Sequence, residues 1–322
     1  AEDGIRDKLV TGVQTCALPI LMDLLMPRMD GVEATRLIMR DTPCPILVVT
    51  ASVNANVGAV FEAIGYGALD AVDTPVLAGG DTAEAAAALR KKIEMLNRLS
   101  VHQAIAAQSV LAHGHAVLPA GRLPLVAIGA STGGPMAIAR VLEKLPAELG
   151  AAVVIAQHMD GSFLEGFAKW LAERTGRDVR IARGGDRIVA NRMYVAGSGG
   201  HLVLTAAGRV AYSAEPSTAL YQPSIDTLFE SVRLHWRGPV VAILLTGMGA
   251  DGAQGLRGLR DSGAFTIAQD EPTSVVYGMP AAAVELDAAV DVLPVDLIGS
   301  AIVDVLARTR SEPVVQTKGS MK

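Results

Sequence analysis

Cysteine and aromatic residues are scarce in this chain, and no hydrophobic run approaches the length of a membrane-spanning helix. The two cysteines, Cys16 and Cys44, form neither a Cys-x-x-Cys pair nor a metal-binding cluster. Such a low cysteine content is typical of a reduced, cytosolic protein rather than of one stabilised by disulfides. The apolar runs are shorter than the roughly 18 residues that a membrane helix needs, and a secretory signal is not evident. We therefore predict a cytoplasmic protein with no membrane insertion.

The chain has no excess of basic charge either. Its formal net charge is −5 and its isoelectric point is near 5.7, which argues against a nucleic-acid partner because such proteins usually carry a basic patch. Half of the residues are hydrophobic, and short runs of Val, Ile and Leu alternate with glycine turns. This pattern predicts an α/β fold with a mostly parallel sheet. At roughly 150 residues per domain, the chain is long enough for about two domains.

The first 80 residues are predicted to form part of a doubly wound α/β domain. Residues 1–20 have no regular pattern, whereas strand-like and helix-like segments alternate from 21 to 73 with short connections. The expected elements are a strand end at 21–23, a helix from Gly31, a strand at 45–50, a helix at 57–64 and a strand at 68–73. We predict a partial domain at 1–80, a linker at 81–122 with a helix over 82–112, a second domain at 123–310 and a tail at 311–322.

The second domain contains at least five buried strand-like runs separated by helical segments, and we predict a three-layer, doubly wound α/β fold for it. The strands are expected at 125–129, 152–157, 193–197, 240–247 and 265–270, and the helices at 135–145, 162–175, 224–236 and 252–262. The turn pairs Gly199-Gly200 and Ala207-Gly208 predict that the run at 193–197 joins 201–205 and 209–213 in a small antiparallel excursion.

Three polar residues of the second domain follow apolar runs at the points where strands should end. Ser131, His158 and Asp251 should therefore face one crevice, because open α/β sheets bind ligands at the carboxyl ends of their strands. Together they could act as nucleophile, general base and orienting acid. Taken singly, each also has a structural interpretation, as a turn residue, a satisfied histidine or a helix cap. His201 and His235 are weaker candidates for the base.

Two glycine-rich stretches allow other interpretations. GASTG at 129–133 matches the nucleophile elbow of α/β-hydrolases, but the order Ser, His, Asp differs from the order Ser, Asp, His in that fold. GMGADG at 247–252 has the spacing of a dinucleotide-binding loop, yet the Asp251 carboxylate would lie where a pyrophosphate must bind. GASTGG also lacks the Lys-Ser/Thr pair of a P-loop. A non-catalytic nucleotide-binding module remains the alternative from another functional class.

Five motifs follow one another in the second domain: GASTGGP, AQHM, YQPSIDTLFESV, LLTGMGADGA and AQDEPTSVVYGMP. In this order, over residues 123–307, they resemble the protein-glutamate methylesterase domain of chemotaxis response regulators. The resemblance implies a serine hydrolase that removes methyl esters from glutamyl side chains of chemoreceptors and, in many members, deamidates receptor glutamines. It implies the cytoplasmic domain of a methylated chemoreceptor as partner, and no cofactor for catalysis. A general small-ester hydrolase without a receptor partner is a third hypothesis.

The same resemblance implies roles for five residues. Ser131 matches the nucleophile, His158 the general base and Asp251 the orienting acid. Thr132 and Met248 match positions that line the site. The backbone N–H of Met248 is the expected oxyanion donor.

In the first domain, LMDLLMPRMDG and PILVVT resemble two conserved stretches of a response-regulator receiver. The resemblance implies that Asp23 is the phosphoacceptor and Thr50 the switch hydroxyl. In the family, a partner histidine kinase supplies the phosphoryl group with Mg²⁺, and phosphorylation relieves occlusion of the esterase cleft by the receiver. VNANVGAVFEAIGYGALDAVDTP further resembles a branch attached to Wsp-type surface-sensing pathways.

The sequence departs from the receiver pattern at two points. Residues 1–20 supply no first strand with the acidic pair that holds Mg²⁺, and Asp23 lies too near the start for two β-α units to precede it. Thr74 stands where a lysine is expected before Pro75. A structural interpretation of Asp23, as a loop carboxylate that carries no phosphoryl group, therefore stays open.

Overall fold

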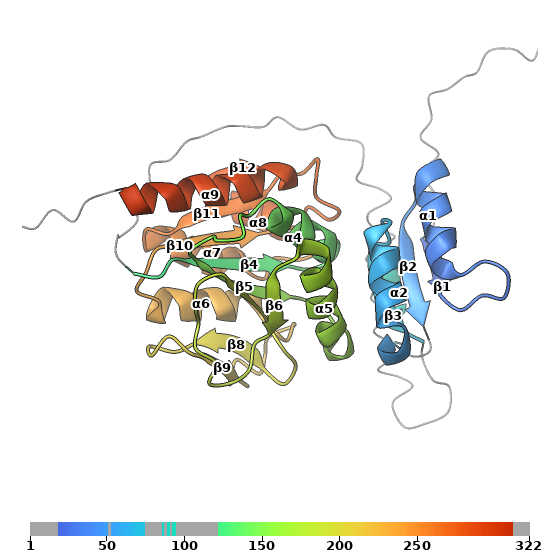
Figure 1. Ribbon diagram of the computed structural model, residues 1–322, viewed down its shortest axis with the longest axis horizontal. Helices are drawn as coiled ribbons and strands as arrows, with labels where there is room; N and C mark the ends of the chain where they lie inside the picture. The colour runs from blue at the N-terminus through green and yellow to red at the C-terminus, as the bar shows by residue number, and fades with distance from the viewer. Residues whose placement is uncertain are drawn as a thin grey trace, which may run out of the picture.

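The computed structural model describes residues 19–50, 53–74, 86, 89–90, 92–94 and 122–311 (Figure 1). They form an N-terminal unit with a three-stranded sheet and a C-terminal unit with a seven-stranded sheet and a two-stranded ribbon. Of the helix expected over 82–112, residues 86, 89–90 and 92–94 are described, and they are helical. The rest of that helix and the linker up to 121 lie outside the described residues, so the domain boundaries stay a prediction.

The large sheet is parallel throughout. Its strands are β4 (Leu125–Ala130), β5 (Ala152–Gln157), β6 (Asp178–Ile181), β7 (Arg192–Val195), β10 (Val240–Leu244), β11 (Phe265–Gln269) and β12 (Asp291–Leu293). They lie in the order β12-β11-β10-β4-β5-β7-β6. The chain builds one side of the sheet from β4 outward and then crosses over to build the other side. The strand order therefore reverses at β4, which is where doubly wound sheets bind their ligands.

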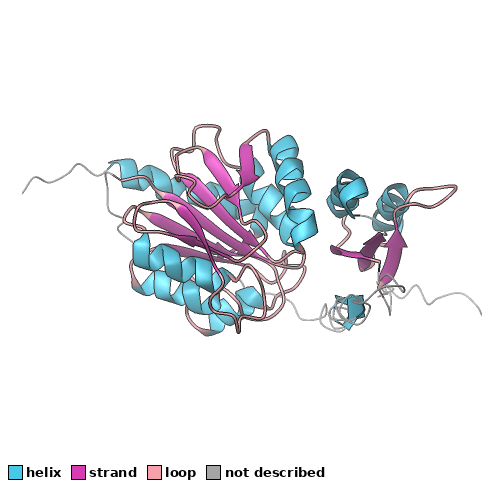
Figure 2. Ribbon diagram, turned by 90° about the horizontal axis from the view of Figure 1, so that it is seen from below, coloured by secondary structure: helices cyan, strands magenta, loops and turns pink. Residues whose placement is uncertain are grey.

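Side chains of β4 alternate between the two faces of the sheet. Val126 and Ile128 pack with the helices α4 (Gly134–Glu143), α5 (Leu164–Thr175) and α9 (Val295–Ser311). Leu125 and Ala127 pack with α6 (Ile225–His235), α7 (Ala253–Asp261) and α8 (Met279–Glu285). Every residue of β4 is buried, as expected for a strand that is covered on both faces. Figure 2 shows the sheet between two helical layers, so the predicted three-layer doubly wound fold is confirmed.

The predicted antiparallel excursion is wrong in one of its three strands. β8 (His201–Leu204) and β9 (Val210–Ser213) do form an antiparallel pair. The run at 193–197, however, contributes β7, which lies in the main sheet between β5 and β6 and is parallel to both. Met193, Tyr194 and Val195 are all buried, and the main sheet provides the cover that such a strand needs on both faces.

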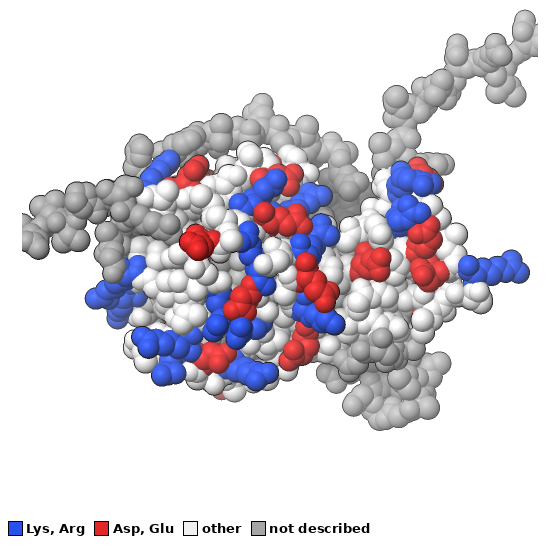
Figure 3. Space-filling model, in the orientation of Figure 1, with Lys and Arg blue, Asp and Glu red and all other residues white. Residues whose placement is uncertain are grey.

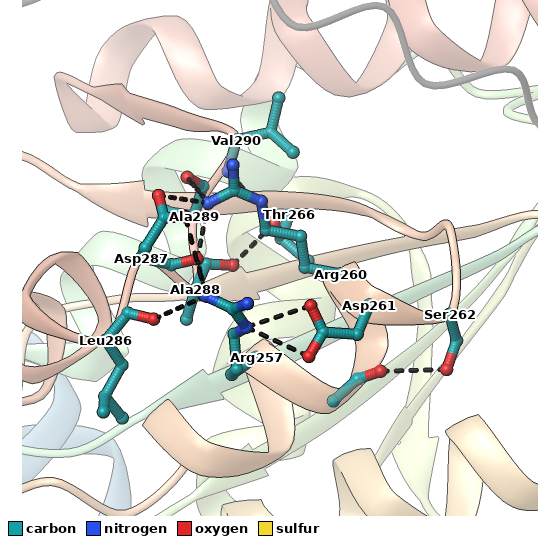
Figure 4. Close-up of polar contacts among 11 residues, drawn as sticks. Arg257, Arg260, Asp261, Ser262, Thr266, Leu286, Asp287, Ala288, Ala289 and Val290 are labelled. Carbon is teal, nitrogen blue, oxygen red and sulfur yellow. Dashed lines mark hydrogen bonds and ion pairs between the residues drawn. The ribbon is translucent and has the colours of Figure 1, made fainter.

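Two arginines fasten the loop after α8 to the end of α7 (Figure 4). Arg257 donates to the carbonyl oxygen of Asp287 at 3.1 Å, and Arg260 donates to the Asp287 carboxylate at 2.6 Å. Nearby, the fully buried hydroxyl of Thr266 donates to the carbonyl oxygen of Ala288 at 2.7 Å. These contacts hold α7, the loop after α8 and β11 together in the half of the sheet that lies away from β5.

The N-terminal unit has the β-α-β-α-β pattern that the sequence predicts. Its elements are β1 (Ile20–Asp23), α1 (Gly31–Asp41), β2 (Ile46–Thr50), α2 (Val53–Gly65) and β3 (Asp70–Asp73). The strands are parallel in the order β1-β2-β3. Asp30 caps α1 by accepting a hydrogen bond from the backbone N–H of Glu33 at 2.7 Å.

The two units contact each other through α2 and α5. The ring of Phe61 on α2 stacks on Trp170 of α5, with 5.5 Å between the ring centroids. Val57 of α2 packs against Gly166 of α5, which has no side chain that would separate the two helices. The backbone N–H of Gly133 donates to the carbonyl oxygen of Leu69, just before β3, at 3.3 Å. The N-terminal unit thus lies against the start of α4.

Basic and acidic side chains are interspersed on the face of the molecule shown in Figure 3. Among the charged pairs of the C-terminal unit are Arg174 with Glu143 at 2.8 Å and Arg192 with Asp178 at 2.9 Å. Charge is therefore balanced locally by neighbouring groups. In the described part of the chain, no helix combines the length and apolar character needed to cross a membrane.

We expect Gly129→Ala to destabilise the C-terminal unit. A Cβ at Gly129 would lie 2.3 Å from Cγ2 of Ile225, so α6 would have to move away from β4, and such overpacking costs about 1–3 kcal/mol. Urea unfolding measures the loss. Gly184→Ala is the matched control, because a Cβ there meets nothing within 4 Å and should change stability by less than about 0.5 kcal/mol. Equal stability of the two variants would contradict the close packing of α6 on β4.

Candidate active site

Ser131 lies in the turn between β4 and α4. Its backbone N–H donates to the carbonyl oxygen of Thr246 at 3.0 Å, and its own carbonyl oxygen accepts from the N–H of Gly134 at 2.8 Å. α4 begins at Gly134 with Pro135 in its first turn, where the missing N–H costs nothing. The serine is 8% exposed. Its position confirms the predicted strand-to-helix corner.

His158 is the first residue after β5. Parallel pairing places Gln157 opposite Ala130, and the N–H of His158 donates to the carbonyl oxygen of Ala130 at 2.9 Å. The histidine therefore leaves the sheet next to Ser131. Its imidazole Nε2 lies 2.8 Å from Oδ2 of Asp251, and the side chain is 5% exposed. The structure thus brings the three predicted residues together at one edge of the sheet.

The carboxylate of Asp251 is held at the N-terminus of α6. Its Oδ1 accepts from the hydroxyl of Ser224 and the N–H of Asp226, each at 3.0 Å, and its Oδ2 accepts from the N–H of Ile225 at 2.7 Å. Burial raises the pKa of Asp251, but the hydrogen bond and charge of His158 and these backbone donors outweigh burial, so the pKa is lowered. The positive end of the helix dipole favours the same charge. The carboxylate is therefore ionised and fixed in orientation.

The orientation of His158 decides which ring nitrogen can act as a base. Because Nε2 bonds the Asp251 carboxylate, the proton of the neutral imidazole lies on Nε2, and Nδ1 keeps its lone pair. Nδ1 is buried and has no hydrogen-bond partner in the described part of the chain. In the serine-protease triad the acid binds Nδ1 and the serine binds Nε2. Here the two nitrogens have the opposite assignment, and Nδ1 is the atom that can take a serine proton.

Tyr221 covers one face of the His158 imidazole. The two rings are stacked, with centroids 4.1 Å apart and planes 11° apart. Burial and the negative charge of Asp251 raise the pKa of Tyr221, so its hydroxyl stays protonated. Sequence reasoning missed this residue, since it lies 63 positions beyond His158 and nothing in its spacing indicates the contact. The motif YQPSIDTLFESV, which begins with Tyr221, was the signal available.

The side chains of Ser131 and His158 line a cavity of about 500 Å³. Thr132 and Met248 also line it, where the sequence places them. Another wall comes from the N-terminal unit, through the β3 residues Asp70–Asp73. Residues of both units therefore line the cavity that holds Ser131.

The glycine-rich loop at 247–252 belongs to this site. The Asp251 carboxylate turns toward α6 and His158. At the start of α7, which this loop opens, the N–H of Gly255 donates to the Asp226 carboxylate at 2.7 Å, so a negative charge already lies where an anion would bind. This arrangement does not favour the nucleotide-binding alternative. His201 is buried and accepts the N–H of Ser224 at Nδ1, at 2.9 Å, so it supports the start of α6. His235 lies in the last turn of α6.

Asp23 and Thr50 end neighbouring strands of the N-terminal sheet, β1 and β2. Asp23 is exposed and accepts the N–H of Leu25 at 3.1 Å. Thr50 is buried, and its carbonyl oxygen accepts the N–H of Thr74 at 2.9 Å. Among the residues that the structure describes, no group of three or more His, Cys, Asp or Glu side chains could hold a metal ion. The Mg²⁺ site and the phosphorylation of Asp23 therefore stay predictions.

A sequence profile described as CheB methylesterase matches residues 126–302, more than half of the chain. The chain belongs to the CheB methylesterase family. The matched range runs from β4 into α9 and includes Ser131, His158 and Asp251. The family predicted from the five motifs is therefore confirmed.

Relatives of this CheB-family chain are similar over most of its length. A protein-glutamate methylesterase/protein-glutamine glutaminase of Cupriavidus metallidurans is 50% identical over 304 residues, which cover 94% of this chain and 88% of the relative. One of Pseudomonas putida is also 50% identical, over 92% of this chain and 89% of the relative. The crystal structure of the Thermotoga maritima CheB methylesterase catalytic domain superposes with a TM-score of 0.54 at 30% identity, covering 57% of this chain and all of that one.

We expect the contribution of the Asp251 carboxylate to stability to disappear in acid. Its pKa is lower in the folded chain than in the unfolded one, so the stabilisation is complete above pH of about 4 and is lost as the pH falls further. Asp251→Asn should therefore destabilise the chain by about 1–3 kcal/mol at pH 7 and by less at pH 3. Urea unfolding of both proteins across this range measures the difference. A difference that does not change with pH would contradict the lowered pKa of the hydrogen-bonded Asp251 carboxylate.

Proposed function

We propose that this CheB-family chain is a protein-glutamate methylesterase of the cytoplasm that hydrolyses glutamyl methyl esters on chemoreceptors. The observation that carries the proposal is the His158–Asp251 pair, which leaves Nδ1 without a hydrogen-bond partner among the described residues, beside the cavity that Ser131 lines. A base with a free lone pair next to a serine suits acyl transfer. The names of the two relatives described above support a glutamyl methyl ester as the substrate.

The geometry supports a two-step hydrolysis. In the first step the Ser131 oxygen attacks the ester carbonyl carbon while its proton passes to Nδ1 of His158, and the imidazolium is stabilised by Asp251. Met248 lines the cavity, and its backbone N–H is the proposed donor to the developing oxyanion. Collapse of the intermediate expels methanol, which takes the proton from His158. In the second step water, deprotonated by the same base, releases the glutamate and restores the serine.

The same steps apply to a glutamine side chain. Attack on the amide carbonyl gives the same acyl-enzyme, and ammonia leaves in place of methanol. We therefore propose protein-glutamine deamidation as a second reaction of this site, in agreement with the double names of the relatives.

We also propose that the N-terminal unit limits access to Ser131. β3 lines the same cavity as the serine, and α2 packs on α5 beside it. A receptor helix is far wider than one side chain, so it can deliver an ester only when this unit moves away. Phosphorylation of Asp23 by a partner histidine kinase is the proposed trigger for that movement.

We expect Ser131→Ala to abolish methanol release from a methyl-labelled receptor, because the variant has no nucleophile and loses on the order of 10³-fold or more in rate. Methanol measured by gas chromatography or as released radiolabel gives the rate. The control is labelling by a fluorophosphonate, which should modify the wild type at Ser131 and leave the variant unmodified.

Wild-type release by Ser131→Ala would exclude the serine as nucleophile. If the wild type cleaves small esters and not the receptor, the chain is instead a general ester hydrolase without a receptor partner.

We expect Gly166→Ala to raise basal methanol release several-fold. A Cβ at Gly166 would lie 1.6 Å from Cγ1 of Val57, so α2 would have to leave α5, while alanine suits the helix itself. Gly58→Ala on α2 is the control, because a Cβ there meets nothing within 4 Å. Equal rates for the wild type and both variants would show that the N-terminal unit does not restrict access.

A further inference from the structure

The side chain of Gln157 bridges the ends of β4 and β5 just where the nucleophile and the base leave the sheet. It is 2% exposed. Its Nε2 donates to the carbonyl oxygen of Ser131 at 2.8 Å and to that of His158 at 3.0 Å. One carboxamide group thus binds the peptide units of both residues whose side chains must exchange a proton.

The side chain of Gln157 connects β4 and β5 beyond their last backbone hydrogen bond. The last ladder contact between the two strands is the hydrogen bond from His158 N–H to Ala130. Beyond it the backbones of Ser131 and His158 diverge into a turn and a loop. A backbone that turns away from a sheet is free to shift by fractions of an ångström unless side chains hold it. The two Gln157 hydrogen bonds supply that restraint on both sides.

The oxygen of the same carboxamide group does not contribute to stability. Oε1 of Gln157 is buried and has no hydrogen-bond partner within the described residues. A buried polar atom without a partner typically costs about 1–3 kcal/mol. The local sequence nevertheless makes room for it, since a Cβ at Gly134 would lie 2.1 Å from this oxygen. If the side chain at this position had only a structural role, an apolar residue would be more stable there. The amide donors of Gln157 therefore indicate another role.

We propose that Gln157 is a positioning residue, which holds the backbones of Ser131 and His158 in the register that the Oγ-to-Nδ1 proton transfer requires. The proposal rests on the proposed function of the site. Gln157 lies behind the two residues and is not required to touch the substrate. Its removal should therefore slow the chemical step and leave substrate binding almost unchanged.

The first test replaces the carboxamide by an apolar group of similar length. For Gln157→Met we expect kcat for methanol release to fall about 10²-fold, the cost of a misplacement of about 1 Å, while KM stays within about twofold. The rate of fluorophosphonate labelling at Ser131 should fall in parallel, because that reaction needs the same activated serine and no receptor.

The second test replaces the amide by a carboxyl group. The new carboxyl of Gln157→Glu would face two carbonyl oxygens in a buried place, so its pKa is raised, and while protonated it can donate one of the two hydrogen bonds. We expect kcat between those of the wild type and Gln157→Met at pH 6, and a further fall toward pH 9 as this proton is lost. The kcat of the wild type should not show this alkaline fall.

The matched control is Thr266→Val. Thr266 is also fully buried and also engaged in two hydrogen bonds, with Ala288 and Val290, but it lies in the layer of β11 and α8. Its loss should lower the unfolding midpoint and leave kcat, KM and the labelling rate within about twofold of the wild type. The comparison separates a general loss of stability from a loss of alignment.

The outcomes are distinct. A kcat of Gln157→Met within about threefold of the wild type, or a loss that appears in KM alone, would overturn the proposal. If Gln157→Met does not fold, the pH profile of Gln157→Glu decides, and a profile parallel to that of the wild type would count against the role. If the wild type releases no methanol but is labelled at Ser131, the proposed function fails, and the labelling rates of the variants still test the positioning role.

Discussion

The active site depends on a negative charge placed at the start of a helix. Asp251 receives hydrogen bonds from three groups at the N-terminus of α6 and from His158. Because all of these partners are donors, the carboxylate is stable in a buried place and cannot rotate without losing several bonds. The hydrogen bond to Asp251 fixes the orientation of the imidazole and leaves Nδ1 as the ring nitrogen that can act as a base. The chemistry of the serine is thus set by a helix on the opposite face of the sheet from α4.

The parallel sheet supplies the rest of the geometry. β10, β4 and β5 are neighbours, so the loop with Asp251, the turn with Ser131 and the residue His158 emerge side by side. Tyr221 covers one face of the imidazole. The β3 residues of the N-terminal unit line the cavity beside it. Catalytic geometry and the proposed control of access therefore belong to separate parts of the chain.

The ends of the strands could be predicted from the sequence because they depend on local patterns. The buried runs before Ser131, His158 and Asp251 identify parallel strands, and parallel strands bring their carboxyl ends to one edge. The ring orientation of His158, the stacking of Tyr221 and the bridge by Gln157 depend on contacts between side chains distant in sequence, and no spacing rule encodes them. The wrong prediction for β7, as part of an antiparallel excursion, has a related cause. Its glycine-flanked sequence suits a hairpin strand equally well, and only burial on both faces distinguishes the two.

The route of the chain gives the site a further property. Ser131 and His158 come from the first half of the C-terminal unit, whereas Asp251 follows β10, the first strand on the other side of β4. A folding intermediate with β4, β5, β6 and β7 in place would hold the serine and the histidine without the carboxylate that orients them. Such an intermediate has no competent base. A competent base therefore requires β10 to be docked beside β4, so that the loop with Asp251 reaches His158.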